Sequence, residues 1–413
     1  MNTKKLPLAF WIFVGLVIGI VAGLALMAIP GGVDFAKTYV KPFGTIFLNL
    51  IKFIVVPIVL FSITAGIISM GDIKKLGSVG VKTIVYYMCT TALAVVIALV
   101  LANLCRGFFP PLDKLAAGEY TASDPVSFMD TLVNIFPANV IEPMRSASML
   151  QVIVIAILFG VGILVAGEKG LVCAQVVDSF NEVSMKVMDL IIRLSPVGVA
   201  CLLAPVVAEN GPKILGALAA VLLVAYIGYV IHALCVYSFS MAALARISPV
   251  AFFREMVPAM MMAFSSASSV GTLPFTLECA EKLGARKEIA SFIIPLGATI
   301  NMDGTAIYQG VCAVFIASCF NIDLTLGQMV TIVLTATLAS IGTAGVPGAG
   351  MVMLAMVLES VGLPVEGIGL VMGVDRIFDM GRTTVNITGD AACAVVISKM
   401  EERKEQRTKG AMV

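Results

Sequence analysis

Five polar side chains near the carboxyl end of the chain share one face of an expected helix. They lie in the stretch GVDRIFDMGRTTVNITGDAACAVVISK and are Asp375, Asp379, Arg382, Asn386 and Asp390. Their spacings of three and four residues place them on the same side of an α-helix. Because an ionisable group at the centre of a bilayer costs roughly 2.5–3.5 kcal/mol on insertion scales, the row is expected to face the protein interior or a water-filled cavity.

Three of these side chains complement the functional groups of an acidic amino acid. Arg382 presents a fixed fork of donors that suits a carboxylate, and Asp379 can hold a cationic amine. Asn386 can donate its amide to a second carboxylate. Two acids and an amine are the groups of aspartate and glutamate. The alternative is an internal Asp379–Arg382 ion pair that only holds helices together.

The motif NMDGT at 301–305 offers oxygen ligands for a cation. Its glycine can break a helix, and the freed backbone carbonyls, together with Asn301 and Asp303, would form an oxygen cage. Asp390 provides a further carboxylate. An oxygen cage without soft ligands suits a hard cation such as sodium. The alternative is a glycine kink with a packed aspartate.

The composition indicates which elements must position these residues. The chain has 413 residues, of which 59% are apolar and 13% charged, whereas soluble domains are near a quarter charged. Lipid must therefore solvate most of the surface, which predicts an all-α polytopic membrane protein. A net charge of +1 gives no support for nucleic acid as a partner. Spans of about 20 apolar residues are expected at 7–29, 43–70, 83–105, 149–167, 182–208 and 213–245.

The last third of the chain has a different pattern, in which apolar arms are too short to cross a bilayer. Arms at 250–264 and up to about 284 flank SSASSVGTLP (265–274), and arms at 326–341 and 351–362 flank GTAGVPGAG (342–350). Each pair predicts a re-entrant hairpin, and the hairpins alternate with helices at 289–320 and 367–398. Paired interrupted segments of this kind indicate the midplane site of a transporter. The alternative is a set of ordinary spans with flexible glycines.

The remaining signals concern orientation and rival chemistries. Most lysines and arginines outside the expected spans fall on the side of the N-terminus, which predicts that both termini are cytoplasmic. The single histidine, His232, lies in an apolar run where a packing role is expected. No nucleophile–base constellation or metal triad is recognisable, so the sequence does not predict an enzyme.

Four motifs resemble those of the dicarboxylate/amino acid:cation symporter family, which includes archaeal aspartate transporters and animal excitatory amino-acid transporters. They are SSVGTLP (268–274), PLGATINMDGT (295–305), SIGTAGVPGAG (340–350) and DMGRTTVNITGD (379–390). The resemblance implies a homotrimer in a bacterial plasma membrane, with eight spanning helices and two re-entrant hairpins in each subunit. It also implies an elevator motion, with the first hairpin as the inner gate and the second as the outer gate.

The resemblance also implies a division of the chain and a set of ligands. Scaffold helices would occupy 1–75 and 149–245, the latter range including a sixth helix. A third helix with an extracellular loop would occupy 76–148, the transport core 246–400 and a cytoplasmic tail 401–413. The implied substrate ligands are Ser268, Ser269, Val346, Gly350, Asp379, Arg382, Thr383 and Asn386. The implied sodium ligands form three sets: Gly297, Asn301, Asn386 and Asp390; Thr299, Ser340, Ile341 and Thr343; and Tyr87, Thr90, Thr91, Asn301 and Asp303.

Two departures from the family pattern concern the substrate site. Archaeal members carry an arginine where this chain has Ala267, and animal members carry one where it has Met380. We therefore expect the site to lack a second arginine beside Asp379 and its gate to open more freely.

Several functions remain open beside a sodium-coupled aspartate or glutamate symporter. They are a four-carbon dicarboxylate carrier, a proton-coupled glutamate symporter, a neutral amino-acid exchanger, an anion channel and a membrane-bound sensor. Asp379 argues against the dicarboxylate carrier because a substrate without an amine leaves it no partner. Arg382 argues in the same way against the neutral exchanger. The absence of a recognisable soluble signalling domain argues against the sensor.

Overall fold

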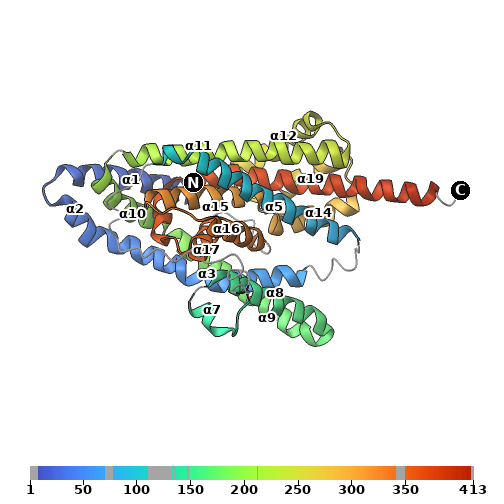
Figure 1. Cartoon of the computed structure of the whole chain (residues 1–413), viewed down its shortest axis with the longest axis horizontal. Helices are drawn as coiled ribbons and strands as arrows, with labels where there is room; N and C mark the ends of the chain where they lie inside the picture. Colours follow the sequence, from blue (N-terminus) through green and yellow to red (C-terminus); the bar gives the residue numbers. More distant parts are fainter. Residues whose placement is uncertain are drawn as a thin grey trace, which may run out of the picture.

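A computed structural model describes residues 8–69, 78–109, 133, 136–146, 148–211, 213–340 and 349–410. Within these residues the chain is helical and contains no β-strand. Most of the long helices run along the long axis of the molecule (Figure 1). The α-helices of the first half are α1 (Leu8–Ala28), α2 (Gly32–Phe35), α3 (Lys41–Ser69), α5 (Ser78–Leu104), α7 (Ile141–Arg145), α8 (Met149–Ala166), α9 (Leu171–Arg193), α10 (Ser195–Asn210) and α11 (Lys213–His232). Those of the second half are α12 (Pro249–Ser266), α13 (Ser269–Lys282), α14 (Lys287–Ile300), α15 (Asp303–Cys319), α16 (Leu326–Ala339), α17 (Ala349–Ser360), α18 (Ile368–Val371) and α19 (Asp375–Gly410).

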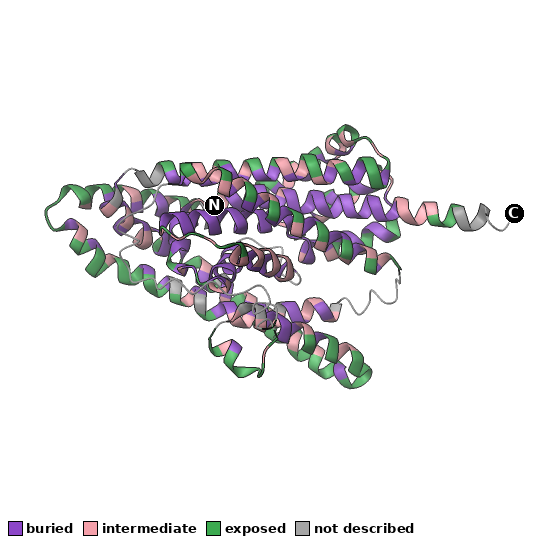
Figure 2. Cartoon of the chain, in the orientation of Figure 1, coloured by how far each residue is buried: buried purple, intermediate pink, exposed green. Residues whose placement is uncertain are grey.

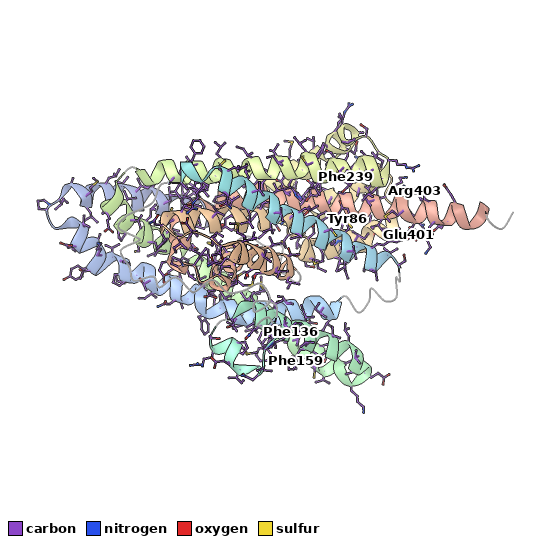
Figure 3. The ribbon with its side chains drawn as sticks, in the orientation of Figure 1. Tyr86, Phe136, Phe159, Phe239, Glu401 and Arg403 are labelled. Atoms are coloured by element: carbon purple, nitrogen blue, oxygen red, sulfur yellow. The ribbon has the colours of Figure 1, made fainter. Side chains whose placement is uncertain are left out.

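Within the described ranges, six helical stretches are long and apolar enough to cross a membrane. They are Phe10–Ala28, Gly32–Ile68, Ser78–Leu104, Gln151–Arg193, Gly216–Ala245 and Lys287–Cys319. Large apolar side chains such as Phe159 and Phe239 lie on the outside of the helices (Figure 3). The expected all-helical polytopic architecture is therefore confirmed, while the count of eight spanning helices stays a prediction.

The single span expected at 182–208 is wrong. The chain instead forms α9, which begins at Leu171, and α10, and the two are separated by a turn at Leu194. Pro196 lies in the first turn of α10, where its missing N–H costs nothing, whereas inside a continuous helix its ring would clash with the preceding turn. α10 then packs along α1, so closely that a Cβ at Gly15 would lie 2.1 Å from the carbonyl oxygen of Pro196.

The first expected hairpin is present, with a shorter tip than predicted. α12 and α13 pack against each other and against α19, and only Ala267 and Ser268 separate them. Ala267 adopts the left-handed conformation (φ 51°), and the Ser268 hydroxyl caps α13 by accepting the Gly271 N–H at 3.1 Å. The cap lets the helix restart within two residues, so Gly271 and Pro274 lie inside α13.

The expected break at NMDGT and the two arms of the second hairpin are also present. α14 ends at Ile300, Asn301 and Met302 are non-helical, and α15 begins at Asp303, so the break spans two residues of the motif. α16 and α17 form the two expected arms of the second hairpin. The tip between them, 341–348, lies outside the described residues.

The buried core is formed by the helices that carry the polar motifs. Every residue of α15 is buried, and this helix packs against α5, α11, α17 and α19. Figure 2 shows the buried residues concentrated along α15 and α19, while exposed residues cover the outer helices. The helices α1, α3, α8, α9 and α10 form a second packed group. The division of the chain into scaffold and transport parts stays a prediction.

The last helix runs without interruption from Asp375 to Gly410 and protrudes beyond the rest of the molecule (Figure 1). Side chains of this extension contact three other segments. Glu401 pairs with Lys82 of α5, Glu405 pairs with Arg286, and Arg403 donates to the carbonyl of Leu244. Glu401 and Arg403 are marked in Figure 3. These contacts join the extension to the ends of neighbouring helices.

Candidate functional site

The polar face of α19 lies inside the protein, as the cost of placing it in lipid predicted. Asp375, Asp379, Arg382, Asn386 and Asp390 are all buried, each less than one-tenth exposed. Thr383, next to Arg382 in the chain, is buried as well. The helical spacing alone placed these side chains on one face, and packing by α14, α15, α12 and α13 covers that face.

Arg382 is the centre of the first cluster. Its Nε donates to Asp379 Oδ1 at 2.9 Å and its Nη1 to Asp375 Oδ1 at 3.1 Å. The guanidinium carbon lies 4.9 Å from the centre of the Tyr308 ring, a distance at which a cation is attracted to an aromatic face. Nη2 lies 2.9 Å from the same Asp379 Oδ1 as an ion-pair contact, although it makes no hydrogen bond among the described residues. The guanidinium is thus held by two carboxylates, and the N–H groups of Nη2 that make no hydrogen bond can donate to a further acceptor.

The residues expected around the substrate lie close to this arginine or at the hairpin tips. Gly350, in the first turn of α17, is buried, and a Cβ there would lie 2.2 Å from Arg382 Nη1. Only glycine leaves room for the guanidinium at this point. Ser269 is buried in the first turn of α13, after the capping Ser268. Val346 lies outside the described residues.

A second cluster joins the NMDGT break to α19. Asn301 donates its amide to Asp390 Oδ1 and to the carbonyl of Asn386, both at 2.9 Å. A Cβ at Gly297 would lie 2.4 Å from Asp390 Oδ1 and 2.5 Å from the Tyr87 hydroxyl, so glycine allows both groups to approach α14. Asn301 Oδ1 and Asp390 Oδ2 are buried and lack hydrogen-bond partners within the described part of the chain.

The two unpartnered oxygens of this cluster indicate whether it can hold a sodium ion. A buried oxygen without a donor is costly, and a cation that accepts oxygen ligands removes that cost. The set contains one carboxylate, amide oxygens and backbone carbonyls, which are the ligands that hard cations prefer. The residues present therefore fit sodium.

A third cluster surrounds Asp303 at the start of α15. Thr91 donates to Asp303 Oδ1 at 2.6 Å, and Thr90 donates to the same oxygen at 3.3 Å. On the other oxygen, Oδ2, the Tyr237 hydroxyl donates at 2.9 Å and His232 Nε2 lies at 3.1 Å. All five side chains are buried. The carboxylate is held from both sides, with Oδ1 turned toward the threonines of α5.

Asn386 and the remaining expected sodium ligands have several different partners. The side-chain oxygen Oδ1 of Asn386 accepts a hydrogen bond from the Gly304 N–H at 2.7 Å, so this residue links α19 to the first turn of α15. The hydroxyls of Thr299 and Ser340 donate to the carbonyls of Leu296 and Thr337 in their own helices. Ile341 and Thr343 lie outside the described residues, and the set to which they belong stays a prediction.

Sequence reasoning missed three residues of these clusters. His232 was expected to serve in packing, and its buried ring does pack edge-on against Tyr237, but its contact with Asp303 was not expected. Tyr237 was not considered as a site residue. Asp375 belonged to the polar stripe but received no role, although it accepts a hydrogen bond from Arg382. A histidine in an otherwise apolar run was the only signal for the first of these.

The expectation that no second arginine lies beside Asp379 is also wrong. Arg376 Nη1 lies 3.8 Å from Asp379 Oδ2. Residues three apart on a helix are neighbours, so an arginine one turn earlier reaches the same carboxylate.

The fold and these clusters define the class of the protein. The described helices include a hairpin interrupted at Ala267 and Ser268 and a helix broken at Asn301 and Met302. Their packing brings buried carboxylates, an arginine and unpartnered oxygens together, which is typical of a secondary transporter. A sequence model of the family described as the sodium:dicarboxylate symporter family matches residues 8–400, and the chain belongs to that family. Its members are symporters and not enzymes.

Three relatives show the range of activities within the family. The proton/sodium-glutamate symport protein of Geobacillus stearothermophilus is 36% identical over 96% of this chain and 95% of its own length. The proton/glutamate-aspartate symporter of Escherichia coli (strain K12) is 36% identical over 98% and 96%, respectively. The C4-dicarboxylate transport protein of Bacillus subtilis (strain 168) is 31% identical over 96% and 94%.

Proposed function

We propose that this chain is a sodium-coupled symporter of aspartate or glutamate. The observation that carries the proposal is the buried Asp379–Arg382 pair, in which Arg382 Nη2 has no hydrogen-bond partner among the described residues. The N–H groups of Arg382 that make no hydrogen bond bind the side-chain carboxylate of the substrate, and Asp379 binds its amine. The transporter works in a bacterial plasma membrane as a homotrimer, with both termini in the cytoplasm and an elevator motion of the transport core.

The choice of substrate depends on Asp379. A four-carbon dicarboxylate has no amine, so it brings two negative charges and no cation to the site of this buried carboxylate. An amino acid supplies the missing cation. The relatives include carriers of both kinds, and Asp379 favours the amino-acid carriers.

The choice of cation depends on the oxygen clusters. The unpartnered Asn301 Oδ1 and Asp390 Oδ2 favour a bound metal cation, since such an ion takes several oxygen ligands at once, including a carboxylate, an amide oxygen and backbone carbonyls. The proton-coupled relatives make proton coupling the second candidate, and the buried carboxylate of Asp390 is the observation that favours it.

Purified protein in liposomes tests the substrate and the cation together. We expect uptake of labelled aspartate or glutamate to follow an inward sodium gradient and to disappear when sodium is replaced by choline or potassium. Uncoupling the proton gradient with a protonophore is expected to leave the initial rate unchanged. Uptake that needs only a proton gradient would establish the proton-coupled alternative, and uptake of succinate in preference to both amino acids would refute the proposal for the substrate.

His232 is expected to govern the sodium requirement through Asp303. Replacing it with leucine removes one of the two side chains that contact Asp303 Oδ2 and leaves the carboxylate less firmly oriented. Hydrogen bonds to charged groups contribute about 1.5–3 kcal/mol, so half-maximal uptake should need roughly 10-fold more sodium or higher. The measurement is uptake against sodium concentration, with the substrate affinity determined separately at saturating sodium.

Two further variants control this prediction. His232→Gln keeps an N–H donor and should restore much of the sodium response, whereas Tyr237→Phe removes the second donor to the same oxygen and should act like His232→Leu. A merely structural role would weaken sodium and substrate binding in parallel. Equal losses in both would show that His232 does not act through Asp303.

A further inference from the structure

Arg376 connects the tip of the first hairpin to the substrate-binding helix. It is the second residue of α19, one turn before Asp379. Its Nη2 donates to the carbonyl of Ser266 at 3.2 Å and to that of Ser265 at 3.4 Å, and these are the last two residues of α12. Its Nη1 lies 3.8 Å from Asp379 Oδ2. One guanidinium therefore contacts both the hairpin and the carboxylate.

The contact with α12 follows from the way that helix ends. The last four carbonyls of a helix have no partners within it and carry a partial negative charge. The left-handed Ala267 stops α12 directly after Ser266, so these carbonyls face α19 and not a further turn of helix. A planar fork of donors can satisfy them and still reach a carboxylate with its other arm.

We propose that Arg376 is a positioning residue that holds the tip of the α12–α13 hairpin on α19 and so slows substrate exchange past that hairpin. The inference rests on the proposed function, because it takes Asp379 as the site of the substrate amine. An amine on Asp379 competes with Arg376 for the carboxylate. Substrate binding thus changes one of the two contacts of the guanidinium, while the bonds to the hairpin carbonyls remain.

The surroundings of Arg376 distinguish it from a substrate ligand. Its side chain is 29% exposed, whereas that of Arg382 is 3% exposed. Its hydrogen bonds go to backbone carbonyls of another helix, which a substrate does not need to displace. Removing it also takes away a competitor for the substrate amine and a positive charge that attracts the substrate carboxylates, and these two effects on affinity oppose each other. The rate of exchange is therefore expected to change more than the affinity.

The test compares Arg376→Ala and Arg376→Lys with the unaltered protein. In liposomes loaded with unlabelled aspartate, we expect Arg376→Ala to exchange labelled aspartate about 2- to 10-fold faster, the range for losing a cation at a helix C-terminus. Equilibrium binding in the same preparation should change less than about 3-fold. Arg376→Lys keeps the charge but not the fork, and it should lie between the two.

A second measurement does not depend on transport. Hydrogen–deuterium exchange of the detergent-solubilised full chain should become faster at 263–271 in Arg376→Ala and stay unchanged in α14. Arg254→Ala provides the matched control, because this exposed arginine lies on the same hairpin away from its tip. It should alter neither the exchange of aspartate nor the deuterium uptake of the tip.

Two results would overturn the inference, and a third would separate it from the proposed function. Unchanged deuterium uptake at the tip in Arg376→Ala would show that the residue does not hold the hairpin, whatever the protein transports. A loss of aspartate affinity by 30-fold or more, with the tip unchanged, would make Arg376 a substrate ligand. If the unaltered protein does not bind aspartate or glutamate, the proposed function fails, and the deuterium experiment still decides whether Arg376 holds the tip.

Discussion

Replacing Arg382 with cysteine should weaken the binding of aspartate and glutamate by roughly 30-fold to several thousand-fold. Truncating one partner of a buried charge pair commonly costs about 2–5 kcal/mol. Arg382 is 3% exposed and pairs with both Asp375 and Asp379, so its removal leaves two buried carboxylates without their main cation. The side-chain carboxylate of the substrate then enters a site whose charge repels it.

Competition binding measures this effect, and neutral amino acids show whether the variant is folded. The smaller cysteine leaves space beside Gly350 and removes the charge, so binding of serine or alanine should be retained or gained. Arg145→Cys is the matched control, because Arg145 is exposed on α7 and pairs only with Glu142 among the contacts described. Undiminished affinity for both acidic amino acids in Arg382→Cys would exclude this arginine as the ligand of the side-chain carboxylate.

The second large effect is expected from Asp390→Asn and Asp303→Asn, which should raise the sodium concentration needed for half-maximal substrate binding by on the order of 10-fold or more. Each change deletes a formal charge from a buried oxygen cage, and the charge of the ligands sets the affinity of such cages. Asp390→Asn is the cleaner variant, because an asparagine oxygen can still accept the Asn301 amide. In Asp303→Asn an amide nitrogen must face hydroxyl or ring donors on one side, so some loss of stability is expected too.

Substrate binding measured across a range of sodium concentrations separates a loss of sodium affinity from a general loss of substrate binding. At saturating sodium, Asp390→Asn should bind aspartate or glutamate nearly as well as the unaltered protein does. Asp323→Asn serves as the control, since its side chain is 88% exposed in the turn between α15 and α16. An unaltered sodium response in Asp390→Asn would remove this carboxylate from the cation site.

Part of the substrate site could be predicted because it lies within one helix. The spacing of Asp379, Arg382 and Asn386 depends only on helical geometry, and their burial depends only on the cost of charge in lipid. The breaks near Ala267 and at Asn301 could also be predicted, since short apolar arms and a glycine-containing motif are not expected to form continuous spans. Such features depend on the conformational preferences of neighbouring residues and on whether those residues tolerate lipid, and both can be read from a short stretch of sequence.

The interactions between helices could not be predicted in this way. His232 and Asp303 are 71 positions apart, and Arg376 and Ser266 are 110 apart. No periodicity relates such pairs, and only the packing of α11, α15, α12 and α19 brings them together. The split of α9 from α10 is a similar case, because the close approach of α1 helps to select the position of α10. The sequence by itself therefore determined that the chain spans a membrane, that helices break near Ala267 and at Asn301, and which residues of α19 face inward. The tertiary structure alone decided which donors orient Asp303 and which arginine holds the hairpin, because those choices depend on contacts between segments that are distant in the chain.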